Sequence, residues 1–143
     1  MGEIRVKVRF ANGQDVLLRA EGKLRRRKVR EVEVEAVADT GAVMTLLPQE
    51  LADKLGLHRF SRKIVVVADN RRILLDQAGP LFLSIGDRDM STDCLVGPPG
   101  CAILVGQLVM EALDLIADPG KRTLTPRPES PDFPVLHMYA LAA

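Results

Sequence analysis

The chain has 143 residues, enough for one domain of ordinary size with its own hydrophobic core. Hydrophobic residues make up 47% and charged residues 27% of the sequence, a composition that argues against disorder over most of the length. Twenty basic and nineteen acidic residues give a net charge of +1, so the overall charge gives no reason to expect nucleic acid or an anionic membrane as the main partner.

The N-terminus passes directly from Met1 into alternating residues, without the apolar segment of a secretory signal peptide. No apolar run approaches the roughly 20 residues that a membrane helix needs, so no membrane partner is expected. Two cysteines, Cys94 and Cys101, are too few for a disulfide framework and have no partners at zinc-binding spacing. These features predict a soluble, cytoplasmic protein with reduced thiols.

The first predicted element is a strand, because apolar and polar residues alternate from Ile4 to Phe10. Asn12-Gly13 is a frequent pair in two-residue hairpin turns, which predicts a turn there. Residues 15–19 are then expected to return from the turn as a second strand.

Residues 23–28 are the one strongly basic run in the chain. No aromatic residue lies between the basic ones to stack on a base, so a solvated hairpin loop is the favoured interpretation. A weaker alternative is an accessory role in nucleic-acid binding, which would be strongly salt-dependent.

Most of the remaining elements are also predicted to be strands. Residues 31–38 alternate and lead to Asp39, and Asp69-Asn70 lies at the predicted turn of a hairpin. The later strands are expected at residues 63–68, 71–75 and 81–85, and in the short apolar runs 94–97 and 102–106.

Helical patterns are few and short. Pro48 suits the first turn of a helix over residues 48–55, Gly56 suits its end, and residues 107–113 predict a second short helix. Many short strands separated by turns predict an all-β, barrel-like or sandwich domain, which we expect over residues 1–126.

Residues 127–143 form a proline-rich segment that we expect to be an extended tail. Its last part, residues 131–143, is largely apolar. It is interpreted either as a disordered end or as an extended segment that docks in a cleft or on a partner subunit.

Asp39 ends an apolar strand, an unfavourable position because burying a carboxylate without partners costs several kcal/mol. Gly41 lets the backbone turn sharply, and Thr40 supplies a hydroxyl group. Two carboxylates face to face would share one proton, so that one activates water while the other donates a proton to a carbonyl. The chain contains a single Asp-Thr-Gly, so such a pair requires two chains.

Ala-Asp-Thr-Gly-Ala at 38–42, followed by Leu-Leu-Pro at 46–48, resembles the retropepsin-type aspartic proteases, which are the retroviral proteases and their bacterial single-domain relatives. Leu-Val-Gly-Pro at 95–98 and Ile-Leu-Val-Gly at 103–106, before a short helix, resemble later segments of that family. The resemblance covers residues 4–126. It implies a small closed β-barrel-like domain that dimerises, with the active site at the dimer axis and no cofactor.

The resemblance also implies roles for individual residues. Asp39 would be the catalytic aspartate, Thr40 would hydrogen-bond across the dimer, and Gly41 would present its backbone to substrate. The hairpin at residues 65–75 falls where the family has its flap. The residues implied to contact a peptide or protein substrate are Ala42, Val67, Ala68, Asp69, Asn70, Cys101 and Ile103, although a small buried apolar role is about equally suitable for Cys101.

Two departures from the family pattern motivate a second hypothesis. The predicted flap tip contains no glycine, and Val43 and Gln107 stand where the retroviral enzymes carry an acidic residue and an arginine. The alternative is a peptide-binding or dimerisation module that keeps this fold with little or no catalysis.

Overall fold

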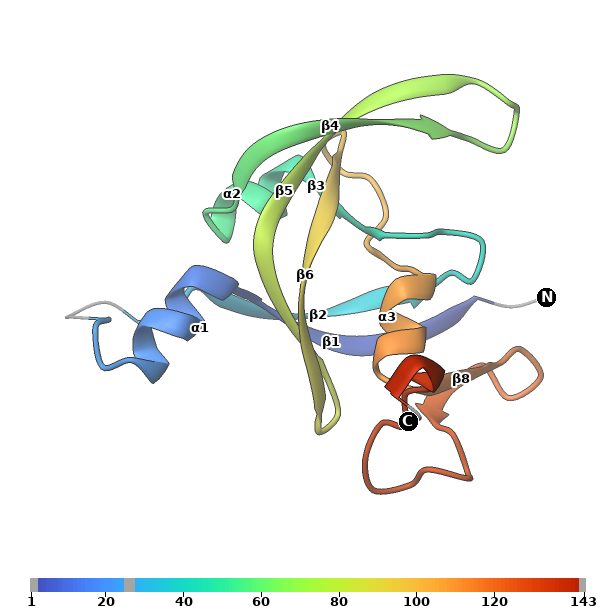
Figure 1. Ribbon diagram of the computed structural model, residues 1–143. Coiled ribbons are helices and arrows are strands. Elements are labelled where there is room, and N and C mark those ends of the chain that lie inside the picture. Colours follow the sequence, from blue (N-terminus) through green and yellow to red (C-terminus); the bar gives the residue numbers. More distant parts are fainter. Residues whose placement is uncertain (1–2, 25–27, 142–143) are drawn as a thin grey trace.

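The computed structural model describes residues 3–24 and 28–141 (Figure 1). Strands make up 47% of them, more than any other element, and the helices are short. In chain order the elements are β1 (Ile4–Asn12), α1 (Gly13–Ala20), β2 (Glu31–Ala38), β3 (Thr45–Pro48), α2 (Gln49–Lys54), β4 (His58–Val66), β5 (Arg72–Ile85), β6 (Arg88–Gly97), β7 (Leu104–Val105), α3 (Gln107–Ala112), β8 (Leu115–Asp118), β9 (Thr123–Pro126) and the 3-10 helix η1 (Tyr139–Leu141).

Within the described residues, seven strands form one sheet in the hydrogen-bonded order β1-β2-β7-β3-β6-β5-β4, and β1 also pairs with β5. The pairing therefore returns from β5 to β1 and joins six of these strands in a ring, while β4 pairs with β5 outside it. Strands β8 and β9 form a separate antiparallel pair. The predicted all-β fold with short helices is confirmed.

The hydrophobic core lies inside the ring of strands. Alternation along β1 buries Val8 and Phe10 completely, while Lys7 and Arg9 point to solvent. Helices α2 and α3 add apolar side chains to the same core, including Leu51 and Val109. Because each large buried side chain contributes about 1.5–3 kcal/mol to folding, this core holds the strand ends in fixed positions around the candidate site.

The prediction of a hairpin turn at Asn12-Gly13 is wrong, because Asn12 caps helix α1 instead. Its side-chain oxygen accepts the backbone N–H of Asp15 at 3.0 Å, which satisfies one of the free amides at a helix start. The Asn12 amide group also donates to the carbonyl of Leu55 at 2.8 Å. Residues 15–19 therefore form most of α1, not a returning strand.

A part-buried ion pair between Arg30 and Asp15 fixes the first turn of α1. The Asp15 side chain has no exposed surface and accepts hydrogen bonds from the Arg30 Nε and backbone N–H at 2.8 and 3.0 Å. This pairing raises the pKa of Arg30 above its ordinary value. The contact anchors the segment that enters β2, the strand that leads to Asp39.

The basic run at residues 23–28 lies only partly within the described residues. Lys23 and Lys28 are exposed, and residues 25–27 lie outside the described part of the chain. The solvated-loop interpretation of the whole run therefore stays a prediction.

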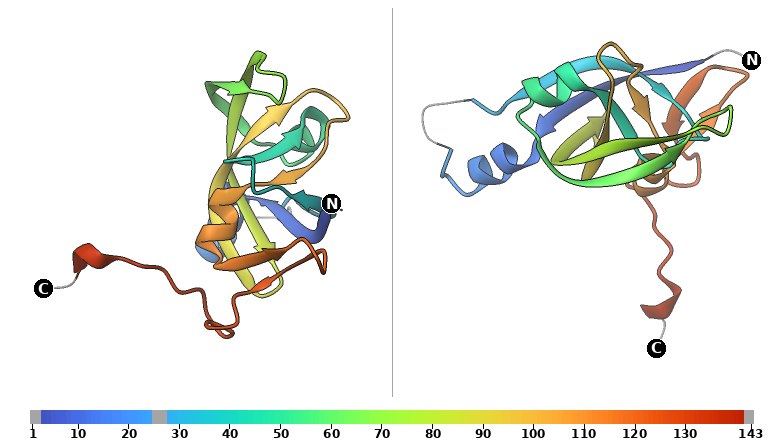
Figure 2. Two further views of the ribbon diagram at one scale, coloured as in Figure 1. Left: turned by 90° about the vertical axis from the view of Figure 1, so that its right-hand side faces the viewer. Right: turned by 90° about the horizontal axis from the view of Figure 1, so that it is seen from above.

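The other predicted elements are found close to their expected places. The hairpin around Asp69-Asn70 is β4–β5, and the two expected helices are α2 and α3. Strand β9 ends at Pro126, and the last part of the chain leads away from the body of the molecule in both views of Figure 2. The domain boundary at residue 126 stays a prediction.

Candidate active site

Asp39 lies directly after the last residue of β2, where that strand runs parallel to β7. Its backbone N–H donates to the carbonyl of Val105 at 2.9 Å, so the pairing with β7 continues through Asp39. Val105 is fully buried, whereas Asp39 is half-buried. The residue is therefore fixed to the sheet through its backbone while its side chain is accessible at the surface of the protomer.

The turn after Asp39 brings a backbone amide to its carboxylate. The N–H of Gly41 donates to Asp39 Oδ1 at 2.9 Å, and the N–H of Ala42 donates to the Asp39 carbonyl at 3.1 Å. A Cβ on residue 41 would lie 3.2 Å from the same Oδ1, which is a tight contact. Glycine permits this close approach, and Thr40, at the tip of the turn, is exposed.

The loop after this turn, residues 42–44, packs against Gly106. The N–H groups of Gln107 and Leu108 donate to the carbonyls of Ala42 and Val43 at 2.7 and 3.1 Å. A Cβ on Gly106 would lie 2.7 Å from the Met44 carbonyl oxygen and would also collide with the rest of the loop. The Asp-Thr-Gly turn and the start of α3 are thus one tightly packed unit.

Two of the predicted substrate-binding residues, Cys101 and Ile103, lie on the segment that leads into β7. The carbonyl of Ile103 accepts the backbone N–H of Val37 at 2.9 Å. Ile103 therefore lies beside β2, hydrogen-bonded to a residue that is two positions before Asp39. The Cys101 side chain packs on Gly97, where a Cβ would lie 2.6 Å from its Sγ. Both residues are half-buried.

The four predicted flap residues, 67–70, form the tip of the β4–β5 hairpin. Their hydrogen bonds are local: Asn70 N–H donates to the Val67 carbonyl at 2.9 Å, and Val67 N–H to the Arg71 carbonyl at 3.0 Å. Asn70 has φ 63°, a left-handed conformation that asparagine tolerates better than most residues. A tight tip without glycine is therefore possible because Asn70 takes the position that requires a positive φ.

The hairpin tip and the Asp-Thr-Gly turn lie on the same side of the molecule. In Figure 1 the β4–β5 hairpin and the loop between β2 and β3 both extend to the right, and the view from above in Figure 2 agrees. Side chains on the two faces of the hairpin differ in burial. Val65, Ile73 and Leu75 are half-buried, whereas Ile64, Val66 and Leu74 on the opposite face are exposed.

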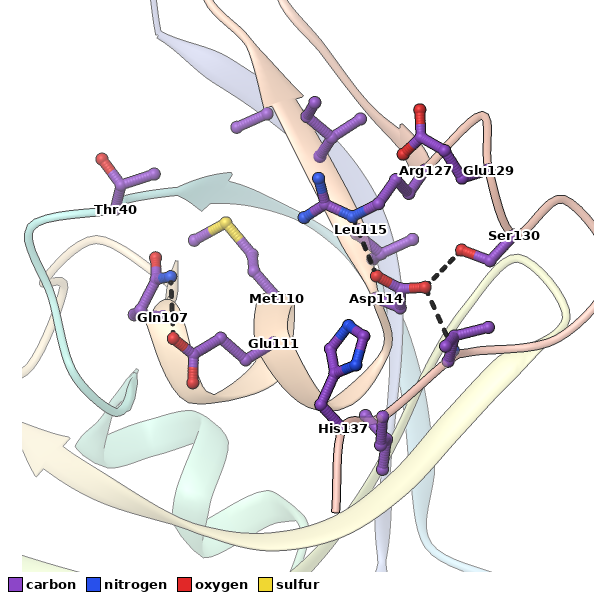
Figure 3. Close-up of a pocket in the computed structure, with 14 residues that line it drawn as sticks. Thr40, Gln107, Met110, Glu111, Asp114, Leu115, Arg127, Glu129, Ser130 and His137 are labelled. Atoms are coloured by element: carbon purple, nitrogen blue, oxygen red, sulfur yellow. Dashed lines mark hydrogen bonds and ion pairs between the residues drawn. The ribbon is translucent and has the colours of Figure 1, made fainter. Parts of the chain in front are cut away.

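A cavity of about 850 Å³ opens beside the turn, between α3, β8 and the tail (Figure 3). Its lining includes Thr40 and Gln107 on one side and Val135 and His137 of the tail on another. The sequence left open that the tail docks in a cleft, but it did not predict this cavity, because the lining residues come from distant parts of the chain.

Asp114 is the most highly connected side chain at this cavity. It accepts hydrogen bonds from Arg127 Nε at 3.0 Å, from the Val135 backbone N–H at 3.0 Å and from the Ser130 hydroxyl (Figure 3). These contacts, that of Ser130 first, lower the pKa of Asp114 to about 2. We call Asp114, Arg127, Ser130 and Val135 the Asp114 cluster; it holds the start of the tail against the end of α3.

Arg88 supports the Asp114 cluster from the opposite side. It is buried, and its guanidinium donates to the carbonyls of Leu113 and Asp114 at 2.8 and 3.1 Å and to that of Ser130 at 2.5 Å. A cation at the carboxyl end of a helix is favourable, because the last carbonyls lack helical partners. One sequence feature could have indicated the site: Asp114 is a charged residue between the apolar residues Leu113 and Leu115.

Both cysteines are free thiols. Burial, with a smaller effect of the neighbouring Asp93, raises the pKa of Cys94 to about 12, so that residue stays protonated. Across residues 3–24 and 28–141, no group of three or more His, Cys, Asp or Glu side chains could hold a metal ion. No helix in this part of the chain has the length and apolar character to span a membrane, and the cytoplasmic location stays a prediction.

A small all-β domain with an Asp-Thr-Gly turn at the end of an inner strand, next to a projecting hairpin, has the architecture of a retropepsin-like protein. Residues 26–110 match the family model described as aspartyl protease. The chain therefore belongs to the retropepsin-like aspartyl protease family. The matched range includes the Asp39 turn, the β4–β5 hairpin, and Gly106. No curated protein matches the chain as a relative.

Proposed function

We propose that the protein is an aspartic endopeptidase that acts as a homodimer and hydrolyses peptide bonds in a peptide or protein substrate. The observation that carries this proposal is the Asp39–Gly41 turn, in which an accessible carboxylate is held by a backbone amide at 2.9 Å. Family membership supports protease chemistry in general.

In the proposed dimer the two Asp39 carboxylates face each other across the twofold axis and share one proton, because two like charges in contact do not both ionise. The ionised Asp39 takes a proton from a bound water as the water oxygen attacks the peptide carbonyl carbon. The protonated Asp39 gives its proton to the carbonyl oxygen. Collapse of the tetrahedral intermediate then breaks the C–N bond. The leaving amine takes the proton held by one Asp39, and a hydroxyl of the intermediate returns its proton to the other Asp39, which restores the shared proton of the pair. The scheme requires no metal or organic cofactor.

Exposed residues around the turn support the twofold arrangement. Thr40 is exposed, where it can hydrogen-bond to a second copy, and Val43 next to the turn is 67% exposed. Leu108 is hydrogen-bonded to Val43 through the backbone and is also exposed. An accessible apolar surface beside a half-complete site is suited to contact with a second copy.

The proposed substrate contacts lie on both sides of Asp39. The flap residues 67–70 would close over the peptide, and Ala42, Cys101 and Ile103 would contact it from the body of the protein. The half-buried face of the hairpin is apolar, with Val65 and Ile73 paired across it. We therefore expect a preference for apolar side chains around the scissile bond.

The Asp39→Asn variant tests the proposal. Without an ionisable carboxylate, peptidase activity should fall by about 10²–10⁴-fold or more, because acid–base catalysis is lost while the side-chain size is kept. Asp87→Asn, which changes an exposed aspartate in the β5–β6 turn, is the matched control and should keep full activity. Full activity of Asp39→Asn against a susceptible peptide would show that the proposal is wrong.

The second candidate function is peptide binding without turnover. It is favoured by the tip of the hairpin, which lacks glycine and carries an exposed ion pair between Asp69 and Arg71 at 2.7 Å. A cleavage assay over a range of pH with an aspartic-protease inhibitor, run beside a peptide-binding assay, separates the two candidates. Saturable binding without any inhibitor-sensitive cleavage would favour the binding module.

A further inference from the structure

The tail beyond the Asp114 cluster carries a series of exposed apolar side chains. Leu136 is 59% exposed, Met138 64%, Tyr139 80% and Leu141 77%. The segment contains no Lys, Arg, Asp or Glu. We call residues 136–141 the C-terminal arm. Such a concentration of exposed apolar residues is unusual for a protein surface and indicates a contact with another molecule.

The arm projects from a fixed origin. The last tail residue held by Asp114 is Val135, whose backbone N–H donates to the carboxylate at 3.0 Å. Beyond it, the backbone hydrogen bond recorded within the arm is internal, from Leu141 to Met138 at 3.0 Å. Both views in Figure 2 show the arm leading away from the body of the protein. The Asp114 cluster therefore sets where the arm starts, and the exposed apolar side chains of the arm are accessible to a partner.

The origin of the arm lies beside the candidate active site. Val135, Leu136 and His137 line the same cavity as Thr40 and Gln107 (Figure 3). Thr40 is the residue that the proposed function assigns to the dimer contact. A partner that approaches Thr40 thus comes close to the point where the arm leaves the body.

The composition and length of the arm fit a second copy of this chain. The arm has no Lys or Arg, and His137 is its single basic side chain, so it lacks the cluster of cations that binds nucleic acid or an anionic membrane. With residues 139–141 in the 3-10 helix η1, the six residues reach at most about 16 Å, enough to cross from one subunit onto an adjoining one. A twofold dimer uses each such contact twice, so both arms would add apolar burial to the same interface.

We propose that the C-terminal arm of each protomer packs its apolar side chains on the partner subunit and stabilises the active dimer. The proposal rests on the homodimer of the proposed function and adds to it an interface outside the Asp-Thr-Gly turn. The Asp114 cluster directs the arm by holding its start against the end of α3.

Sedimentation velocity over a range of protein concentrations tests the arm in an Asp39→Asn background, where no self-cleavage can occur. Truncation after Val135 removes the arm but keeps every member of the Asp114 cluster. It should raise the dimer Kd at least about tenfold. The triple variant Leu136→Ser, Met138→Ser and Leu141→Ser in the full chain should have a similar effect. The matched control is Leu17→Ser, which removes an equally exposed apolar residue from α1 and should leave the Kd unchanged.

An unchanged Kd in both arm variants overturns the arm proposal and leaves the homodimer in place. A full-length protein that stays monomeric at every concentration overturns both. Hydrogen exchange of residues 136–141 adds a second readout, because contact with a partner should increase their protection as the protein concentration rises. Protection that does not depend on concentration would mean that the arm packs on its own subunit and would contradict the proposal.

Discussion

At the scale of single residues, two glycines permit the geometry around Asp39 in different ways. Gly41 allows its own amide to approach the Asp39 carboxylate, and Gly106 allows α3 to begin directly against the loop after the turn. Neither glycine has a positive φ, so close packing and not backbone conformation excludes a side chain at these positions.

Gly106→Ala should therefore destabilise the fold and impair the site together. The added Cβ would lie 2.7 Å from the Met44 carbonyl oxygen and 2.8 Å from that of Ala42, and backbone atoms cannot move aside easily. We expect a loss of about 1–3 kcal/mol in the free energy of unfolding, measured by urea titration. Activity should fall by about 10²-fold, because the Asp39 turn would be displaced.

Gly120→Ala is the control for this substitution. Gly120 lies in the β8–β9 turn, where a Cβ would meet the Asp118 side-chain oxygen at 3.3 Å, and that side chain can shift. This variant should keep its stability and activity near the wild-type values. Equal losses in the two alanine variants would contradict the packing argument for Gly106.

At the scale of secondary-structure elements, the Asp114 cluster joins the end of α3 to the tail. Asp114 has φ 54°, a left-handed conformation that asparagine also adopts readily, so Asp114→Asn removes the charge with little change in the backbone. The variant should be less stable than wild type at neutral pH, because Arg127 and Ser130 lose a charged acceptor.

The stability difference should depend on pH in a defined direction. Folding lowers the pKa of Asp114 from 3.8 to about 2, so its contribution is complete above about pH 4 and is lost as the pH falls toward 2. Urea midpoints of the two proteins should therefore converge between pH 4 and pH 2. Asp87→Asn is the control and should follow wild type throughout. A difference that stays constant with pH would contradict this account of the cluster.

Comparison of α1 with the β4–β5 hairpin shows how much of the fold the sequence predicts. The hairpin was predictable because its strands and its Asp69-Asn70 turn are local features. Helix α1 was not, because Asn12-Gly13 suits a hairpin turn as well as a helix start. In the folded protein the Asn12 side chain also donates a hydrogen bond to the carbonyl of Leu55, which is 43 residues away in the sequence. Contacts of that range are not visible in a local pattern.

The candidate site likewise has one part that the sequence predicts and one part that it does not. The Asp39 turn was predictable, because Asp-Thr-Gly at the end of an apolar strand combines chemistry and turn geometry in a few neighbouring residues. The Asp114 cluster was not, since its members come from the end of α3 and from a tail without regular structure. Their proximity results from folding.

At the scale of the whole molecule, a single Asp-Thr-Gly sequence implies that one protomer holds half of the proposed site. Thr40, Val43 and Leu108 beside the turn are exposed, so a second protomer can contact them and complete the proposed site. The proposed dimer would combine three features: the paired Asp39 carboxylates, the flaps over them, and the C-terminal arms.

A mixing experiment tests the central claim most directly, because it asks whether one site contains Asp39 from two chains. Wild-type protein at fixed concentration is mixed with increasing amounts of Asp39→Asn protein, and peptidase activity is measured after the subunits have exchanged. If the site is shared, excess variant draws wild-type chains into dimers with a single Asp39 carboxylate, and activity should fall toward zero. The Asp87→Asn protein, added in the same excess, should cause no such loss. Activity that stays constant with excess Asp39→Asn would mean that each chain carries a complete site, and it would contradict the paired-aspartate account.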